Sequence, residues 1–281
     1  MTINAAPPVP ALAAGNLAVV TGGASGIGLA AARAFTDLGM RVCIVDRDEA
    51  ALKLAVAEVG GEVATFAADV SDRGSMAALA ATITAWHGPV SVLMNNAGVG
   101  CGGDVLADPA GWERVLGVNL MGVLHGVQSF LPGMLAGDRP GLVINTGSKQ
   151  GITQPPGNTA YNVSKAGVKA LTEGLAHTLR QETAGRVSAH LLIPGYTYTG
   201  MTAGRSTEKP AGAWSSEQVV AFLLAGIAAG DFYLLCPDNE TSSDQDRRRI
   251  LWAAGDLVEN RPALSRWHPD WSEAFAAHMA E

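Results

Sequence analysis

Short apolar runs alternate with longer stretches of helical periodicity between residues 17 and 236. The runs are apolar on both faces and bounded by Gly, Asp or Asn, which is typical of parallel strands buried beneath helices. They predict seven strands, at 17–21, 41–45, 63–67, 90–94, 141–146, 187–193 and 232–236. Ala- and Leu-rich stretches predict helices at 26–38, 48–59, 73–87, 109–136, 160–184 and 215–229, with Ser71 and Ser215 as N-caps. We therefore expect an α/β fold built on a doubly wound seven-stranded parallel sheet flanked by helices.

The domain organisation follows from where this alternation begins and ends. A chain of 281 residues is long enough for two domains at about 150 residues each. No linker or internal repeat interrupts 17–236, so we expect one domain there, a flexible Pro/Ala-rich N-terminal arm at 1–16, and a C-terminal extension of the same domain at 237–281. Pro and Gly break up the uncharged N-terminal stretch, which argues against a signal peptide or membrane span.

Composition limits the kinds of molecule that the protein is expected to bind. Hydrophobic residues make up 48% of the chain and the formal net charge is -7, which favours a large core and disfavours a nucleic-acid surface. The three cysteines are far apart and lack CxxC spacing, and the six histidines show no HxxxH or HxH grouping. We therefore expect no disulfide framework and no metal site, a cytoplasmic location, and partners that are small molecules or copies of the same chain, with neither nucleic acid nor a membrane.

A glycine-rich turn joins the first predicted strand to the first predicted helix. Residues 19–28 read VVTGGASGIG, and Gly22, Gly26 and Gly28 permit a tight turn that brings backbone N–H groups and a helix N-terminus toward a pyrophosphate. Such a corner can also be purely structural. The interpretation as a dinucleotide site is favoured by Asp46, eighteen residues after Gly28 at the end of the second strand, where a carboxylate accepts hydrogen bonds from ribose hydroxyls.

The same carboxylate bears on the choice between NAD and NADP. Asp46 would repel a 2'-phosphate and accept a free 2'-hydroxyl, so NAD is favoured, and the neutral Ser25 agrees with this. Arg47 is the opposing observation because it can reach toward a phosphate. Its acidic neighbours favour a solvated surface arginine instead.

Candidate catalytic residues lie in the second half of the predicted sheet. Tyr161 and Lys165 are four residues apart, which places them on one face of a predicted helix. In isolation this pair would read as an exposed pair on an amphipathic helix. Ser148, however, lies thirteen residues upstream at the carboxyl end of a predicted strand, where parallel sheets bind ligands. Asn119 lies in a long apolar stretch, where a buried amide needs partners.

Together these residues resemble the short-chain dehydrogenase/reductase family, in its TGxxxGxG and YxxxK branch. The resemblance covers about 17–236 and rests on TGGASGIG at 21–28, Asp46, Asp69-Val70, NNAG at 95–98, Asn119, Ser148, Tyr161, Lys165 and Pro194-Gly195. It implies a Rossmann fold that binds NAD. The sequence departs from the family at one position, where Thr197 replaces the usual Val of the PGxVxT motif. The cofactor-binding residues so expected are Gly22, Ala24, Ser25, Gly26, Ile27, Gly28, Asp46, Arg47, Asp69, Val70, Asn96, Ala97, Gly98, Tyr161, Lys165, Pro194, Gly195, Thr197 and Thr199.

The resemblance implies hydride transfer between NAD and a secondary alcohol or ketone. Tyr161 is expected as general acid/base, Lys165 as the charge that favours its phenolate, Ser148 as the hydrogen-bond donor to the reacting oxygen, and Asn119 as the anchor of a relay water. Two alternatives stay open, an NADP-dependent ketone reductase and a catalytically silent NAD-binding regulator. A nucleotide-sugar epimerase or dehydratase does not fit the glycine spacing.

The surroundings of the site are less strongly predicted. Substrate-facing candidates lie at 99–103, 149–156 and 196–214. The aromatic tail at 261–271 is expected either to anchor the extension to its own domain or to pack near the mouth of the pocket or on a neighbouring subunit. The helices at 109–136 and 160–184 are apolar over more than one face, which predicts a homodimer or homotetramer.

Overall fold

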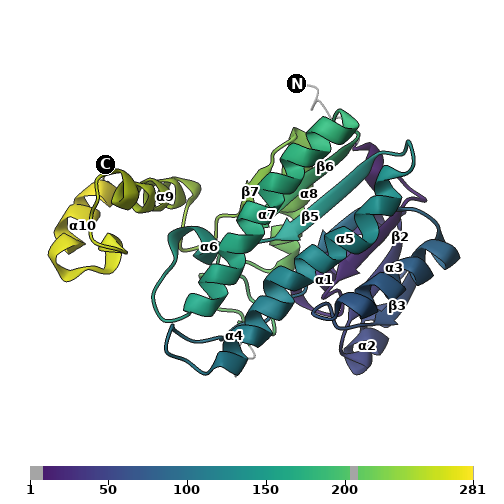
Figure 1. Ribbon diagram of the computed structural model, residues 1–281, viewed down its shortest axis with the longest axis horizontal. Coiled ribbons are helices and arrows are strands. Elements are labelled where there is room, and N and C mark those ends of the chain that lie inside the picture. The colour runs from purple at the N-terminus through teal and green to yellow at the C-terminus, as the bar shows by residue number, and fades with distance from the viewer. Residues whose placement is uncertain (1–8, 203–207, 281) are drawn as a thin grey trace.

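The computed structural model describes residues 9–202 and 208–280. Its centre is one parallel sheet with the strand order β3-β2-β1-β4-β5-β6-β7 (Figure 1). The strands are β1 (Leu17–Thr21), β2 (Arg41–Asp46), β3 (Val63–Ala67), β4 (Val90–Asn95), β5 (Gly141–Thr146), β6 (Val187–Ile193) and β7 (Tyr233–Leu235). This confirms the predicted doubly wound, seven-stranded parallel sheet.

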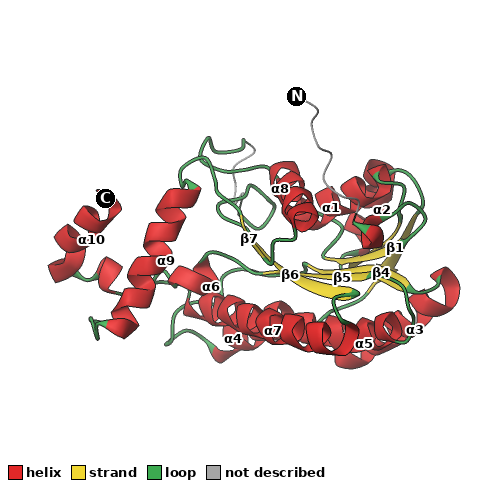
Figure 2. Cartoon of the chain, turned by 90° about the horizontal axis from the view of Figure 1, so that it is seen from above, coloured by secondary structure: helices red, strands yellow, loops and turns green. Residues whose placement is uncertain are grey.

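Helices cover both faces of the sheet, so the molecule has three layers (Figure 2). One face carries α1 (Gly26–Asp37), α2 (Glu49–Val59) and α8 (Ser216–Ala229). The other carries α3 (Arg73–His87), α5 (Gly122–Leu135) and α7 (Thr159–Thr183). The short helices α4 (Pro109–Leu116) and α6 (Gln150–Thr153) lie together at one end of this second layer, next to α7.

Alternation along the strands divides the core into two halves. Val20, Ile44 and Met94 belong to the apolar cluster beneath α1 and α8, whereas their neighbours Val45 and Leu93 belong to the cluster beneath α3 and α5. Because both faces are covered, all six residues of β4 are buried. This explains why the strands read as continuous apolar runs in the sequence.

The helical stretch from Pro109 to Leu135 is apolar and long enough to cross a membrane by length and composition, but half of its most apolar 18-residue window is buried inside the fold. It consists of α4, a π-helical turn η2 (Gly117–Met121) and α5. Phe130 and Met134 lie in the core beneath the sheet. This burial is that of a core helix, and it accounts for part of the apolarity noted in the sequence.

Helix capping agrees with one expectation and corrects another. Ser215 caps α8, since its side chain accepts from the Gln218 N–H in a reciprocal capping box. Ser71 does not cap α3. Asp72 does, by accepting from the Ser75 N–H, while the Ser71 hydroxyl donates to Asp69 at 2.7 Å. The expectation of Ser71 was therefore wrong by one residue, because the stronger acceptor next to it takes the cap.

The predicted N-terminal arm differs from the structure in its second half. Residues 1–8 lie outside the described part of the chain, whereas Pro10–Leu12 form a short 3-10 helix. Ala11 is buried, and the Asn16 side chain donates to the Pro10 and Ala11 carbonyls. Ala11 belongs to the core cluster beneath α1 and α8, and Val9 and Leu12 pack against it, so this part of the expected arm is folded onto the body.

The C-terminal extension forms α9 (Ser243–Val258) and α10 (Ser272–Ala280), which project from the body beside α6 (Figure 1). Its aromatic residues pack on one another. The Trp252 ring lies 6.3 Å from Trp271 and 5.3 Å from Phe275, and the Arg261 guanidinium lies 4.2 Å above it. The aromatic tail therefore packs within the extension, and none of the described residues of the extension lines the cavity described below. Packing of the tail on a neighbouring subunit stays a prediction.

Two glycines of α5 provide a test of core packing. A Cβ added at Gly126 would lie 2.0 Å from the Asn95 Oδ1, whereas one added at Gly133 would meet nothing within 4 Å. We expect Gly126→Ala to lower the free energy of unfolding by about 1–3 kcal/mol through overpacking. Gly133→Ala in the same helix should be neutral or raise it by roughly 0.5–1 kcal/mol. Denaturant unfolding measures both, and equal effects would contradict the packing described.

Candidate active site

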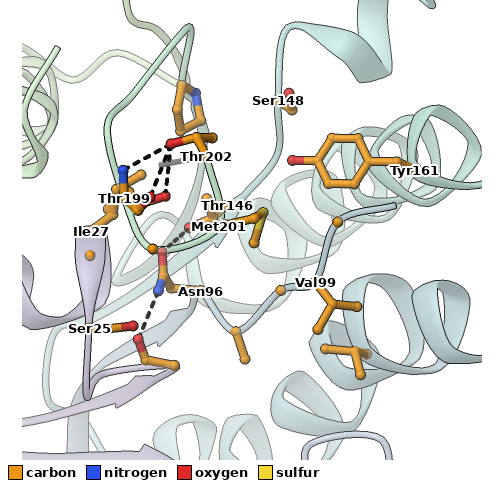
Figure 3. A pocket seen from close by; sticks show the side chains of 18 of the residues that line it. Ser25, Ile27, Asn96, Val99, Thr146, Ser148, Tyr161, Thr199, Met201 and Thr202 are labelled. Carbon is orange, nitrogen blue, oxygen red and sulfur yellow. Dashed lines mark hydrogen bonds between the residues drawn. The ribbon is translucent and has the colours of Figure 1, made fainter. Parts of the chain in front are cut away.

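A cavity of about 580 Å³ opens at the carboxyl edge of the sheet. It is lined by loops that follow β1 to β6, and it straddles β1 and β4, where the strand order reverses. Open parallel sheets bind ligands at this switch point, because the loops on its two sides diverge and leave a crevice. Figure 3 shows side chains converging on the cavity from these loops.

The glycine-rich turn is held against β4 so closely that side chains do not fit. Gly22 and Gly26 have φ of +62° and +53°, in the left-handed region that favours glycine. A Cβ at Gly22 would lie 2.7 Å from the Ala97 Cα, and one at Gly28 would lie 2.1 Å from the Gly22 oxygen. The turn therefore presents bare backbone to the cavity just where α1 begins, as phosphate binding at a helix N-terminus requires.

Acidic side chains lie at the far end of the cavity from the YxxxK helix. The Asp46 carboxylate at the end of β2 accepts from the Ala24 N–H at 3.3 Å and from the Asp48 N–H at 3.2 Å. Asp69 follows β3, and hydrogen bonds from Ser71 lower the pKa of its carboxyl group. Arg47 lines the same end. These groups fit the hydroxyls and base of an adenosine moiety.

Ser148, Tyr161 and Lys165 meet at the opposite end. The Tyr161 hydroxyl points into the cavity with Ser148 beside it (Figure 3). The buried Lys165 ammonium donates to the Thr146 carbonyl at 2.8 Å and lies 5.7 Å from the centre of the Tyr161 ring. The sequence predicted that these three residues lie at one edge of the sheet, and the structure places them together there.

Burial acts on both titrating groups. It raises the pKa of Tyr161, although a hydrogen bond with Ser148 opposes this, and it lowers the pKa of Lys165 to about 8. Below about pH 8 Lys165 is therefore mainly an ammonium, 5.7 Å from the ring centre of a phenol whose own ionisation is disfavoured in the protein alone. The positive charge beside the ring is the group that can offset this when a phenolate must form.

Asn119 lies outside the cavity lining, in the π-helical turn η2, and is fully buried. Its side chain accepts from the Val99 N–H at 2.7 Å and donates to the Val99 carbonyl at 2.9 Å and to Ser164 Oγ at 3.2 Å. The amide therefore has its partners within the protein. What it does in this structure is fix the loop after β4 against α7.

Most of the expected cofactor-binding residues line the cavity, but Ala24 and Gly28 do not. Ala24 acts through its N–H on Asp46, and Gly28 through its packing under Gly22. No residue of 149–156 lines it, so Lys149 and Gln150 are not substrate-facing in this structure. The sequence reasoning missed five lining residues: Ala68, Arg114, Val118, Thr146 and Gly147. Ala68, Val118 and Gly147 adjoin residues that had been singled out, and Thr146 lies two residues before Ser148. Arg114, one turn before Val118, gave no signal.

Comparison with known proteins agrees with this geometry. A family model described as short chain dehydrogenase matches residues 16–210. The chain belongs to the short-chain dehydrogenase family. It is 41% identical over 193 residues to galactitol 2-dehydrogenase (L-tagatose-forming) of Cereibacter sphaeroides, a match that covers 67% of this chain and 74% of that one.

Solved short-chain dehydrogenase structures also resemble it. A short-chain dehydrogenase/reductase from Burkholderia phymatum, in complex with NAD, is 33% identical, with a TM-score of 0.79 over 88% of this chain and 96% of its own. A metagenomic short-chain oxidoreductase in complex with NADP is 32% identical, with a TM-score of 0.66 over 80% of this chain and 98% of its own. The short-chain dehydrogenase family binds a nicotinamide cofactor, and these two relatives differ in which one they hold.

Proposed function

We propose that the protein is an NAD-dependent dehydrogenase that transfers a hydride between NAD and a secondary alcohol or ketone. The observation that carries the proposal is that one cavity holds both kinds of residue that the reaction needs. Asp46 lies at one end of it, and Ser148, Tyr161 and Lys165 lie at the other. The similarity to a galactitol 2-dehydrogenase supports an alcohol as substrate.

The cavity suits a dinucleotide along its whole length. Gly22 and Gly26 leave room for a pyrophosphate at the start of α1, and Asp46 and Asp69 would hold the adenosine. At the other end Pro194, Gly195, Thr197 and Thr199 line the cavity beside the catalytic residues, where they would hold the nicotinamide. A nicotinamide held there would supply the acceptor for the hydride of the carbinol carbon, or the hydride donor in the reverse direction.

The chain's own residues move the proton. In oxidation the Tyr161 phenolate takes the proton of the alcohol hydroxyl while the C–H bond breaks, and in reduction the phenol gives it back. The Lys165 ammonium beside the ring favours the phenolate over the phenol. Ser148 donates to the reacting oxygen, a contact of the kind whose loss costs about 2.7–4 kcal/mol of barrier. Asn119 supports the site by holding the Val99 loop.

NAD is favoured over NADP by the position of Asp46. Its carboxylate lies against the backbone of the glycine-rich turn, where a 2'-phosphate would meet like charge. The NADP-dependent alternative keeps one observation in its favour, because Arg47 lines the same end of the cavity. A silent regulator has no such support, since Ser148, Tyr161 and Lys165 are all present and close together.

Tyr161→Phe tests the acid/base role. Removing one oxygen should lower kcat for alcohol oxidation about 10²–10⁴-fold, because no group takes the hydroxyl proton. Binding of NADH, followed by fluorescence titration, should persist. The matched control is Tyr233→Phe, which removes a phenol oxygen on β7 outside the cavity and should retain turnover. Assays of NADH formation from secondary alcohols, polyols included, measure both variants, and near wild-type turnover by Tyr161→Phe would refute the mechanism.

Asp46→Ser tests the cofactor choice. The wild-type protein should show a higher kcat/KM with NAD than with NADP, and the substitution should reduce that ratio by about tenfold or more, roughly 1.4 kcal/mol, because like-charge repulsion is removed. Asp37→Ser, an exposed change at the end of α1, serves as control and should leave the ratio unchanged. A wild-type preference for NADP would favour the alternative.

A further inference from the structure

Lys149 directly follows the proposed catalytic Ser148, yet its side chain is buried outside the cavity. Its ammonium lies 3.1 Å from an Asp238 carboxylate oxygen and 2.5 Å from an Asp246 carboxylate oxygen. The three side chains, which we call the Lys149 triad, are 15%, 6% and 6% exposed, respectively. Ion pairs shielded from water to this degree are screened far less than surface pairs, and breaking one leaves a charge buried without its partner.

The triad contacts both loops at the reactive end of the cavity. The Lys149 N–H donates to the Pro194 carbonyl at 3.3 Å, and Asp238 Oδ2 accepts from the Tyr196 N–H at 3.2 Å. A Cβ at Gly195 would lie 2.5 Å from Asp238 Oδ2 and 2.8 Å from the Lys149 ammonium nitrogen. The two charged groups therefore pack directly on the Gly195 backbone, between the end of β5 and the end of β6.

Both acidic members come from beyond the predicted catalytic domain. Asp238 follows β7 in a turn where its Oδ1 accepts from the Glu240 N–H at 3.1 Å and the Thr241 N–H at 2.7 Å. Asp246 lies in the first turn of α9, which packs beside α6. Through Lys149 the C-terminal extension is thus joined to the segment that carries Ser148.

Charge in the triad is unbalanced, with two carboxylates against one ammonium. Burial is the main influence on Asp246 and raises the pKa of its carboxyl group, against the opposing effects of Lys149 and Arg249. Burial also raises the pKa of Asp238, but hydrogen bonds from Tyr196, Lys149 and Glu240 together with the Lys149 charge outweigh it and hold that pKa below its usual value. An ammonium with several fixed acceptors has one favourable position, so the network specifies one geometry of the surrounding backbone.

We propose that Lys149 is a positioning residue. With Asp238 and Asp246 it fixes Ser148 and Gly195 relative to Tyr161 and makes the C-terminal extension part of the scaffold of the active site. The inference rests on the proposed function, since it assigns the triad to the alcohol and nicotinamide end of the cavity and not to the adenosine end.

Lys149→Met and Asp246→Asn test the proposal. Small misplacements of catalytic groups lower kcat steeply, so we expect Lys149→Met to reduce kcat about 10–100-fold, while KM for NAD changes far less because Asp46 and the glycine-rich turn are untouched. Asp246→Asn keeps the shape and one acceptor, and Asp238 still pairs with Lys149, so its loss should be smaller. Lys169→Met, which breaks a half-exposed pair with Glu173 on α7, is the matched control and should retain kcat.

Hydrogen–deuterium exchange of residues 147–153 and 194–198 supplies a readout independent of turnover. Faster exchange in both segments in Lys149→Met and Asp246→Asn, and not in Lys169→Met, supports the proposal. Unchanged exchange in these variants overturns it. The proposal is also overturned if a variant has a lower melting temperature but keeps the wild-type kcat at a temperature where it is fully folded. If Lys149→Met fails to fold, Asp246→Asn decides. A wild-type protein that is inactive on every alcohol tested would refute the proposed function. The exchange measurement alone would then test whether the Lys149 triad fixes the two segments.

Discussion

A buried ammonium at the reactive end of the cavity is the group around which the proposed chemistry is arranged. Lys165 is buried within the fold, donates to the Thr146 carbonyl, and lies against the face of Tyr161. Desolvation lowers its pKa to about 8, so the charged form is held at a cost to stability near neutral pH. A perturbed group of this kind, located in a cleft beside a phenol and a serine, is typical of an active site.

Lys149 follows Ser148 in the sequence, and Lys165 lies on α7 beside Tyr161. Their different surroundings give these two lysines different roles. Lys149 forms ion pairs with the Asp238 and Asp246 carboxylates, so its positive charge is neutralised within the scaffold. Lys165 makes no ion pair among the described residues, and its ammonium donates to a neutral carbonyl. Its field is therefore free to act on Tyr161. The contrast separates a positioning lysine from one that we propose to be catalytic.

The sheet and the site were predictable because each depends on local patterns. Strands that are apolar on both faces were recognisable in the sequence. Because these strands are parallel, their carboxyl ends bring Gly22, Asp46 and Ser148 to one edge of the sheet, where Tyr161 joins them. The C-terminal extension was not predictable in this way, since its core depends on Trp252 meeting residues far along the chain. The buried position of Lys149 was missed because its partners lie 89 residues or more away in sequence. The predicted homo-oligomer and the choice of NAD stay predictions.

The most direct test of the account is the proton balance of NAD binding. The account holds that Lys165 and the positively charged nicotinamide together lower the pKa of Tyr161, which burial raises in the protein alone. Calorimetric titration at roughly pH 8, in buffers of different ionisation enthalpy, should show that the wild-type protein releases more protons than Tyr161→Phe when NAD binds. Equal proton release by the two proteins would contradict the assignment of Tyr161 as the acid/base group.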